Sequence, residues 1–118
     1  MASPLKPSIR DLDPRGSSLL IRERAVDPDF VILDVRTPRE YEMGRIEGSV
    51  NIDYHSPGFE AELERLDREK TYLVYCLVGI RSRNAADMME ELGFEDLVNM
   101  VGGIRQWHRE GLPIIVGR

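Results

Sequence analysis

The chain has 118 residues, of which 42% are hydrophobic and 31% are charged, and its net charge is -5. This composition indicates one globular domain with one core, and the acidic balance argues against binding to nucleic acid or anionic membranes, because both require a basic surface. Cys76 is the single cysteine, which excludes an internal disulfide, and no apolar run is long enough to span a bilayer or to form an N-terminal signal, so we expect a cytoplasmic protein without nucleic-acid or membrane partners.

The N-terminal third of the chain predicts an arm, a helix and a buried strand. Residues 1–8 hold two prolines and little periodicity, so we expect a flexible arm before a single domain over residues 9–118. Asp13-Pro14 combines an N-cap with a proline at the first helical position and predicts a helix over residues 14–24. Residues 30–33 are continuously apolar, which is typical of a strand buried on both faces.

The middle of the chain predicts a short helix, a short strand and a second helix. Thr37-Pro38-Arg39-Glu40 has the N-cap, proline and N3 glutamate of a capping box, so we expect a helix from there to about Met43. Residues 49–52 can form a short strand. Ser56-Pro57 begins another helix, whose apolar side chains at helical spacing are Phe59, Leu63 and Leu66.

The C-terminal half predicts two further pairs of a strand and a helix. A strand over residues 71–75 is followed by the strongest helical pattern, over residues 82–92, which Gly93 ends. A short strand over residues 97–99 precedes a helix over residues 103–110. Because buried strands alternate with helices, the predicted fold class is α/β, with an open, mainly parallel sheet and helices on both faces.

Cys76 stands where chemistry is expected, at the carboxyl end of the strand over residues 71–75. Ligands of open parallel sheets bind beyond this edge, and a tight loop that leads into a helix directs its backbone N–H groups inward. Gly79 permits the turn and Arg81 adds a positive charge. Such a loop lowers the pKa of a thiol and holds a negative sulfur, so we predict that Cys76 is a nucleophile. The predicted substrate-binding residues are Leu77, Val78, Gly79, Ile80, Arg81 and Ser82.

Asp34 and Arg36 follow the first buried strand and are expected at the same edge of the sheet, as supporting residues. The charge of Asp34 would oppose ionisation of Cys76, so we expect this carboxylate to accept hydrogen bonds from neighbouring loops rather than to act as a base. Arg36 either pairs with Glu40 or faces the site, since arginine serves both uses. The two histidines lack metal-ligand spacing with each other or with Cys76, so no metal site is predicted.

Three blocks of the sequence resemble the rhodanese-like domains. The first, residues 33–52, runs from Leu-Asp-Val-Arg-Thr-Pro-Arg-Glu-Tyr to Gly-Arg-Ile-Glu-Gly-Ser-Val-Asn-Ile. The second, residues 76–82, is similar to the family's Cys-x-x-Gly-x-Arg-Ser loop, and the third, residues 102–113, holds Gly-Gly, Trp and Gly-Leu-Pro. The resemblance covers about residues 9–114, and three blocks in the right order and spacing are a specific signal.

The resemblance implies a sulfurtransferase. Cys76 would take the outer sulfur of a donor, thiosulfate or a persulfide, and pass it to a thiol, cyanide or a protein acceptor, and no metal or organic cofactor is implied. Arg45 stands where the family usually has histidine, at a position that looks structural. The apolar Leu77, Val78 and Ile80 stand where thiosulfate-using members are often polar or basic, which predicts that thiosulfate is a poor donor and that the loop is a docking surface for a protein.

Two other functions remain open. A rhodanese-like binding or regulatory module with little turnover would share the fold, but the intact Cys76 and Arg81 favour catalysis, because silent members typically lose the cysteine. A cysteine phosphatase or arsenate reductase would use a similar anion-binding loop. Cysteine phosphatases as a family place five residues between the cysteine and the arginine, whereas four are found here, and the smaller ring suits a single sulfur.

Overall fold

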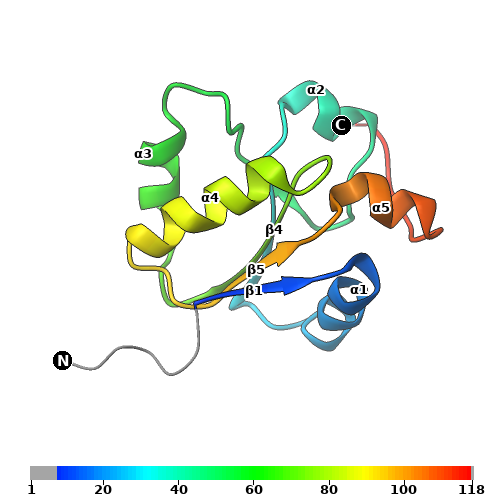
Figure 1. The fold of residues 1–118 in the computed structure, drawn as a ribbon, viewed down its shortest axis with the longest axis horizontal. Helices are drawn as coiled ribbons and strands as arrows, with labels where there is room; N and C mark the ends of the chain where they lie inside the picture. The colour runs from blue at the N-terminus through cyan, green and yellow to red at the C-terminus, as the bar shows by residue number, and fades with distance from the viewer. Residues whose placement is uncertain (1–7, 118) are drawn as a thin grey trace.

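The computed structural model describes residues 8–117, so the predicted arm lies outside the described residues except for Ser8. Strands and helices alternate along the chain (Figure 1). The strands are β1 (Ile9–Leu12), β2 (Phe30–Asp34), β3 (Val50–Asn51), β4 (Thr71–Tyr75) and β5 (Leu97–Met100). The helices are α1 (Pro14–Glu23), α2 (Pro38–Met43), α3 (Phe59–Glu64), α4 (Ile80–Glu91) and α5 (Gly103–Arg109).

The five strands form one sheet in the order β1-β5-β4-β2-β3, and every pair of neighbouring strands is parallel. The predicted open parallel sheet is therefore confirmed. Strand β4 lies at its centre, between β2 and β5, and all of its residues are buried. Because β4 is buried on both faces, Cys76, the residue that follows it, is also shielded from water.

Helices cover both faces of the sheet, as predicted. On one face, α3 and α4 contribute Leu63 and Met89 to a core with Val74 of β4. On the other face, Trp107 of α5 packs with Leu73, and side chains of α1 lie against the same core. Figure 1 shows α1 and α4 on opposite sides of the strands. Among residues 8–117, no helix is both long and apolar enough to cross a membrane.

The edge strand β1 was not predicted from the sequence. Its two central residues, Arg10 and Asp11, are charged and exposed, so the segment lacks an apolar run. The strand exists because it pairs with β5, a partner far along the chain that local pattern does not reveal. The polar residues place this strand at the sheet edge, where charge discourages pairing with a further strand.

Two helix starts also differ from the prediction. Helix α4 begins at Ile80 rather than residue 82, because Gly79 takes the N-cap position with a left-handed φ of 101°. Helix α3 begins at Phe59, after a turn over Ser56-Pro57, and ends before Leu66, which still packs against the core beneath it. By contrast, the capping box at the start of α2 is formed as predicted.

Candidate active site

Cys76 follows the last residue of β4 and is only 1% exposed. The loop behind it curls back, so that the backbone N–H of Gly79 donates a hydrogen bond to the Cys76 sulfur at 3.1 Å. The thiol in turn lies 3.4 Å from the hydroxyl oxygen of Ser82, to which it donates. The predicted nucleophile therefore sits inside a ring of polar groups that its own loop and the start of α4 supply.

Two opposing effects set the acidity of this thiol. Burial favours the neutral form and raises the pKa of Cys76, but the hydroxyl of Ser82 and the backbone N–H groups of Ser82, Gly79 and Val78 favour the thiolate. The hydrogen-bond donors prevail, so the pKa of Cys76 lies below its ordinary value. A larger fraction of this cysteine is consequently ionised at neutral pH than in a free thiol, and the thiolate is the nucleophilic form.

Arg81 does not contribute the free positive charge that the sequence led us to expect. Its guanidinium forms two hydrogen bonds with the carboxylate of Glu40, at 2.9 and 3.1 Å. This pairing lowers the pKa of Glu40 to about 2 and, together with a smaller attraction to the Cys76 sulfur, raises the pKa of Arg81. Arg81 thus ties α4 to α2 across the mouth of the loop, and backbone N–H groups with one hydroxyl stabilise the thiolate.

Asp34 and Arg36 form a buried ion pair at the end of β2. The carboxylate of Asp34 accepts hydrogen bonds from the backbone N–H of Arg36 at 2.9 Å and from its guanidinium at 2.7 to 3.1 Å. The Asp34 carboxylate therefore accepts hydrogen bonds, but from Arg36 two residues on rather than from the neighbouring loops that we expected. Of the two roles left open for Arg36, pairing with Glu40 is not formed, because Nη2 of Arg36 donates both to Asp34 and to the backbone oxygen of Gly44, at 2.7 and 2.6 Å. Arg36 joins β2 to the chain after α2.

Ser82 is part of a longer hydrogen-bonded chain that sequence reasoning missed. Its hydroxyl donates to Oδ1 of Asn99 on β5 at 2.7 Å, and Nδ2 of Asn99 donates to Asp11 on β1 at 3.2 Å. Ser82 and Asn99 are buried, whereas Asp11 is exposed. An asparagine inside an otherwise apolar strand was the available signal, because a buried amide needs partners.

Helix α5 packs directly against the loop that follows Cys76. The backbone N–H groups of Ile104 and Arg105 donate to the backbone oxygens of Cys76 and Leu77, at 2.9 and 3.0 Å. Gly103 makes this contact possible, since a Cβ there would lie 2.2 Å from the Leu77 oxygen. The Gly-Gly pair of the third sequence block therefore allows α5 to approach the backbone of Cys76 and Leu77 closely and to fix the position of their loop.

The three apolar side chains of the loop have different surroundings. Leu77 is partly buried and packs against the core beneath α5. Val78 is 38% exposed and Ile80 is 68% exposed, so both face outward beside the loop that holds Cys76. The outer surface of the loop is apolar, while its inner surface consists of hydrogen-bond donors.

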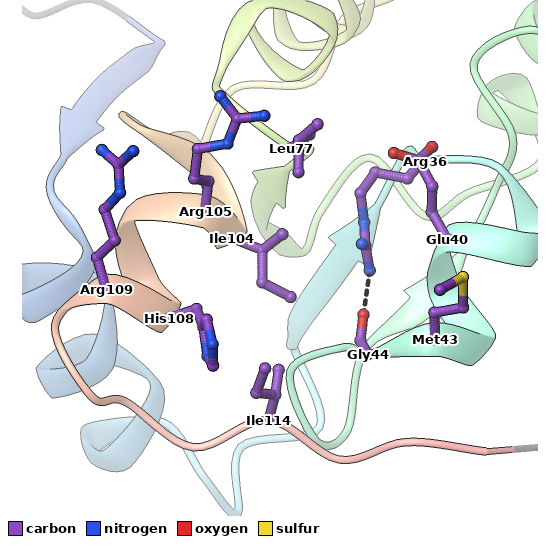
Figure 2. Close-up of a pocket in the computed structure, with 10 residues that line it drawn as sticks. All are labelled: Arg36, Glu40, Met43, Gly44, Leu77, Ile104, Arg105, His108, Arg109 and Ile114. Atoms are coloured by element: carbon purple, nitrogen blue, oxygen red, sulfur yellow. Dashed lines mark hydrogen bonds between the residues drawn. The ribbon is translucent and has the colours of Figure 1, made fainter.

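A pocket of about 490 Å³ adjoins the loop on the side of α2 and α5 (Figure 2). Leu77, Ile104 and Ile114 form part of its wall. His108 lines the same pocket, and the described residues contain no group of three or more His, Cys, Asp or Glu side chains that could hold a metal. Trp107 is a core residue, with its ring nitrogen donating to the backbone oxygen of Pro113 at 2.8 Å.

A cysteine directly after the central parallel strand, in a loop whose backbone N–H groups point at its sulfur, is the arrangement that the rhodanese-like resemblance implied. The model of the rhodanese-like domain matches residues 20–110, and the chain belongs to this family. The fold agrees: a rhodanese-related protein from Thermoplasma volcanium is similar with a TM-score of 0.74 and 31% identity, over 90% of this chain and 97% of that one.

Relatives of known name include sulfurtransferases of similar length. The chain is 29% identical to a sulfurtransferase from Allochromatium vinosum, over 84% of this chain and 91% of the relative. It is 33% identical to the thiosulfate sulfurtransferase GlpE of Glaesserella parasuis, over 80% of this chain and 86% of the relative. It is also 33% identical to a tRNA uridine(34) hydroxylase from Teredinibacter turnerae, but it spans 27% of that protein.

Proposed function

We propose that the protein is a sulfurtransferase that carries sulfane sulfur on Cys76. The observation that carries this proposal is the thiol that accepts a hydrogen bond from the backbone N–H of Gly79 and lies against the Ser82 hydroxyl, with a pKa below its ordinary value. The named sulfurtransferases among its relatives support it. The reaction needs a nucleophilic sulfur and a place for one extra negative sulfur atom, and this loop offers both.

Transfer takes place in two displacements on sulfur. The Cys76 thiolate attacks the outer sulfur of thiosulfate or of a persulfide, the sulfur–sulfur bond of the donor breaks, and the leaving sulfite or thiolate keeps the electron pair. The acceptor, a thiolate, cyanide or a protein thiol, then attacks the outer sulfur of the Cys76 persulfide. The bond to Cys76 breaks, its electron pair returns to the Cys76 thiolate, and the product is a persulfide or thiocyanate. No metal, organic cofactor or further oxidant enters this balance.

The same loop argues against phosphate chemistry. Four residues separate Cys76 from Arg81. Both terminal nitrogens of the Arg81 guanidinium already donate to the Glu40 carboxylate. A tetrahedral phosphoryl group needs more donors than one sulfur atom, and the backbone N–H groups of Gly79 and Ser82 point at the Cys76 sulfur itself. We therefore expect negligible hydrolysis of aryl phosphates and no reduction of arsenate.

A protein partner is a second element of the proposal. The outward-facing Val78 and Ile80 form an apolar border around the loop, which is the type of surface that excludes water when a partner docks. A protein donor or acceptor would bring its own sulfur to Cys76 at this surface. A reduced thiol is required between turnovers, which favours a cytoplasmic location.

The test is thiocyanate formation from cyanide with either donor. The wild type should form thiocyanate, and Cys76→Ser should form none while keeping the fold, because the loop N–H groups remain and the side-chain volume changes little. A Cys76→Ser variant that retains the wild-type rate, or a wild type that hydrolyses an aryl phosphate faster than it transfers sulfur, would disprove the proposal.

A further inference from the structure

The pocket between α2 and α5 has no role in the two displacements at Cys76, yet it is joined to the catalytic loop. Leu77, which directly follows Cys76, lines it. Its other wall, at Ile104 and Arg105, donates backbone hydrogen bonds to Cys76 and Leu77. Cys76 itself is only 1% exposed and does not line the pocket, so a ligand that lies against Leu77 is one residue removed from the sulfur-carrying residue, on a wall that is hydrogen-bonded to the Cys76 backbone.

Positive charge exceeds negative charge around this pocket. Glu40 is the acidic residue that lines it, and its carboxylate is occupied by Arg81 and Thr37. Arg36 is neutralised by Asp34. Arg105 and Arg109 are exposed, one helical turn apart on α5, and no acidic side chain within residues 8–117 pairs with either.

An acidic protein thus carries uncompensated positive charge at the border of one apolar pocket. Figure 2 shows Arg105 and Leu77 on one side of this pocket, with Ile104, His108 and Ile114 below them. Apolar walls accept an apolar body, and a few charged groups at the border fix the orientation of the ligand. The chemistry that fits is a molecule with an apolar body and an anionic end.

We propose that this pocket binds the non-reacting part of the sulfur acceptor, and that the preferred acceptor is a thiol with an apolar body and a carboxylate. This inference rests on the proposed sulfur transfer. The apolar body lies against Leu77 and Ile104, the carboxylate meets Arg105 and Arg109, and the thiolate at the other end attacks the outer sulfur of the Cys76 persulfide. The bonds that form and break are those already given for a thiol acceptor.

The test compares two acceptors of equal length with the full chain, mercaptohexanoate and mercaptohexanol, at pH values where both thiols ionise alike. We expect kcat/KM to favour the carboxylate about fivefold, the size of two exposed charge contacts. Arg105→Gln combined with Arg109→Gln should abolish this preference. Arg39→Gln removes the same charge from the exposed surface of α2, outside the pocket, and should leave the preference unchanged.

The possible results separate this inference from the sulfur transfer itself. If Cys76 takes up sulfur but the wild type uses both thiols equally, or if Arg39→Gln reduces the preference as much as the double variant, the pocket assignment is wrong and sulfur transfer stands. If mass spectrometry finds no sulfur on Cys76 with any donor, the proposed function is wrong, and with it the inference.

A second inference rests on the hydrogen-bonded chain that runs from the buried Ser82 and Asn99 to the exposed Asp11. A hydroxyl has one proton, and here the Ser82 proton is directed to Asn99 rather than to the Cys76 sulfur. The amide of Asn99 cannot reverse without turning its oxygen toward the Asp11 carboxylate, which now accepts from its nitrogen. Asp11 therefore fixes which end of Asn99 faces Ser82.

We infer that Asn99 is a positioning residue that holds the Ser82 proton away from the sulfur until the thiol ionises, with Asp11 setting its orientation. When the thiolate forms, the hydroxyl turns to the charged sulfur, which is the stronger acceptor, and Oδ1 of Asn99 loses its donor in a buried site. Asn99 thus opposes ionisation of Cys76. The other charged groups around the thiol, Arg81 with Glu40 and Asp34 with Arg36, are paired with each other and stay unchanged in the test.

The experiment measures the rate of Cys76 alkylation by iodoacetamide against pH. Asn99→Leu, which keeps the shape of the side chain, should raise the alkylation rate on the acidic limb by about threefold to tenfold, because Ser82 is then free to donate to sulfur. Asp11→Asn should have a smaller effect in the same direction. Asp87→Asn is the matched control. Asp87 is the other carboxylate that pairs with Arg83, and it takes no part in the hydrogen bonds that link Ser82, Asn99 and Asp11.

A slower or unchanged alkylation in folded Asn99→Leu would overturn the inference. So would an equal effect of Asp87→Asn and Asp11→Asn, because both would then act only through surface charge. If Asn99→Leu does not fold, the comparison of the two aspartate variants decides alone.

Discussion

Two arginines reach the carboxyl edge of the sheet, and their surroundings differ. Arg36 is almost wholly buried with Asp34, two residues before it in the chain. Arg81 is partly exposed and pairs with Glu40, which lies 41 residues away on another helix. The buried pair fixes the fold around the site, whereas the partly exposed pair of Arg81 and Glu40 borders the site and holds two helices together within reach of solvent. An arginine in a family motif therefore need not be the group that lowers the pKa of the nucleophilic thiol.

The largest difference between the two pairs should appear in stability. Asp34→Leu leaves Arg36 as a buried charge without its partner and should lower the free energy of unfolding by about 3–5 kcal/mol. Glu40→Gln removes a partly exposed partner of Arg81 and should cost about 1 kcal/mol. Urea unfolding of both variants measures this, and equal losses would show that the two pairs serve the same purpose.

The acidity of Cys76 should depend on Ser82 more than on the pair of Arg81 and Glu40. Ser82→Ala removes the hydroxyl that favours the thiolate, so the pKa of Cys76 should rise and alkylation at neutral pH should slow about fivefold. Replacing Arg81 and Glu40 together by methionine removes equal and opposite charges and should change the alkylation rate less. A larger effect of the double replacement would restore Arg81 as the main cause of the low pKa.

The pair of Arg81 and Glu40 should also give a pH dependence of stability. Arg81 holds the pKa of Glu40 at about 2, below the ordinary value of 4.5. A carboxylate whose pKa is lowered by folding contributes stability that is fully present above pH 4.5 and is lost as the pH falls toward about 2. The stability difference between wild type and Glu40→Gln should therefore shrink over this interval. Urea unfolding at several pH values checks it, and a constant difference would mean that Glu40 does not titrate with folding.

The smallest expected effect concerns the sulfur donor. Arg81 is paired with Glu40, and the outer loop residues Val78 and Ile80 are apolar. The loop around Cys76 therefore offers little unpaired positive charge to a dianion. Thiosulfate should therefore have a lower kcat/KM than a small-molecule persulfide, which steady-state kinetics with cyanide as acceptor would measure. Equal values for the two donors would show that charge at the loop does not select the donor.

Local sequence patterns predicted most of the helices and strands, but they did not predict which distant side chains would pair at the site. The capping box of Thr37 and Glu40 and the turn at Gly79 involve residues close in sequence, so their geometry follows from residue type. The acid that binds Arg81 comes from another helix, and Asn99 meets Ser82 only because β5 lies beside β4. Such pairings depend on the order of strands in the sheet, which a single sequence does not specify.

The central claim is that Cys76 carries sulfane sulfur, and a mass spectrum of the intact protein tests it most directly. After incubation with a persulfide donor, the chain should gain the mass of one sulfur atom, located on Cys76, and cyanide should remove it with release of thiocyanate. Cys76→Ser should gain nothing. An unmodified wild type after exposure to both donors, or a sulfur adduct on Cys76 that cyanide does not remove, would contradict the account.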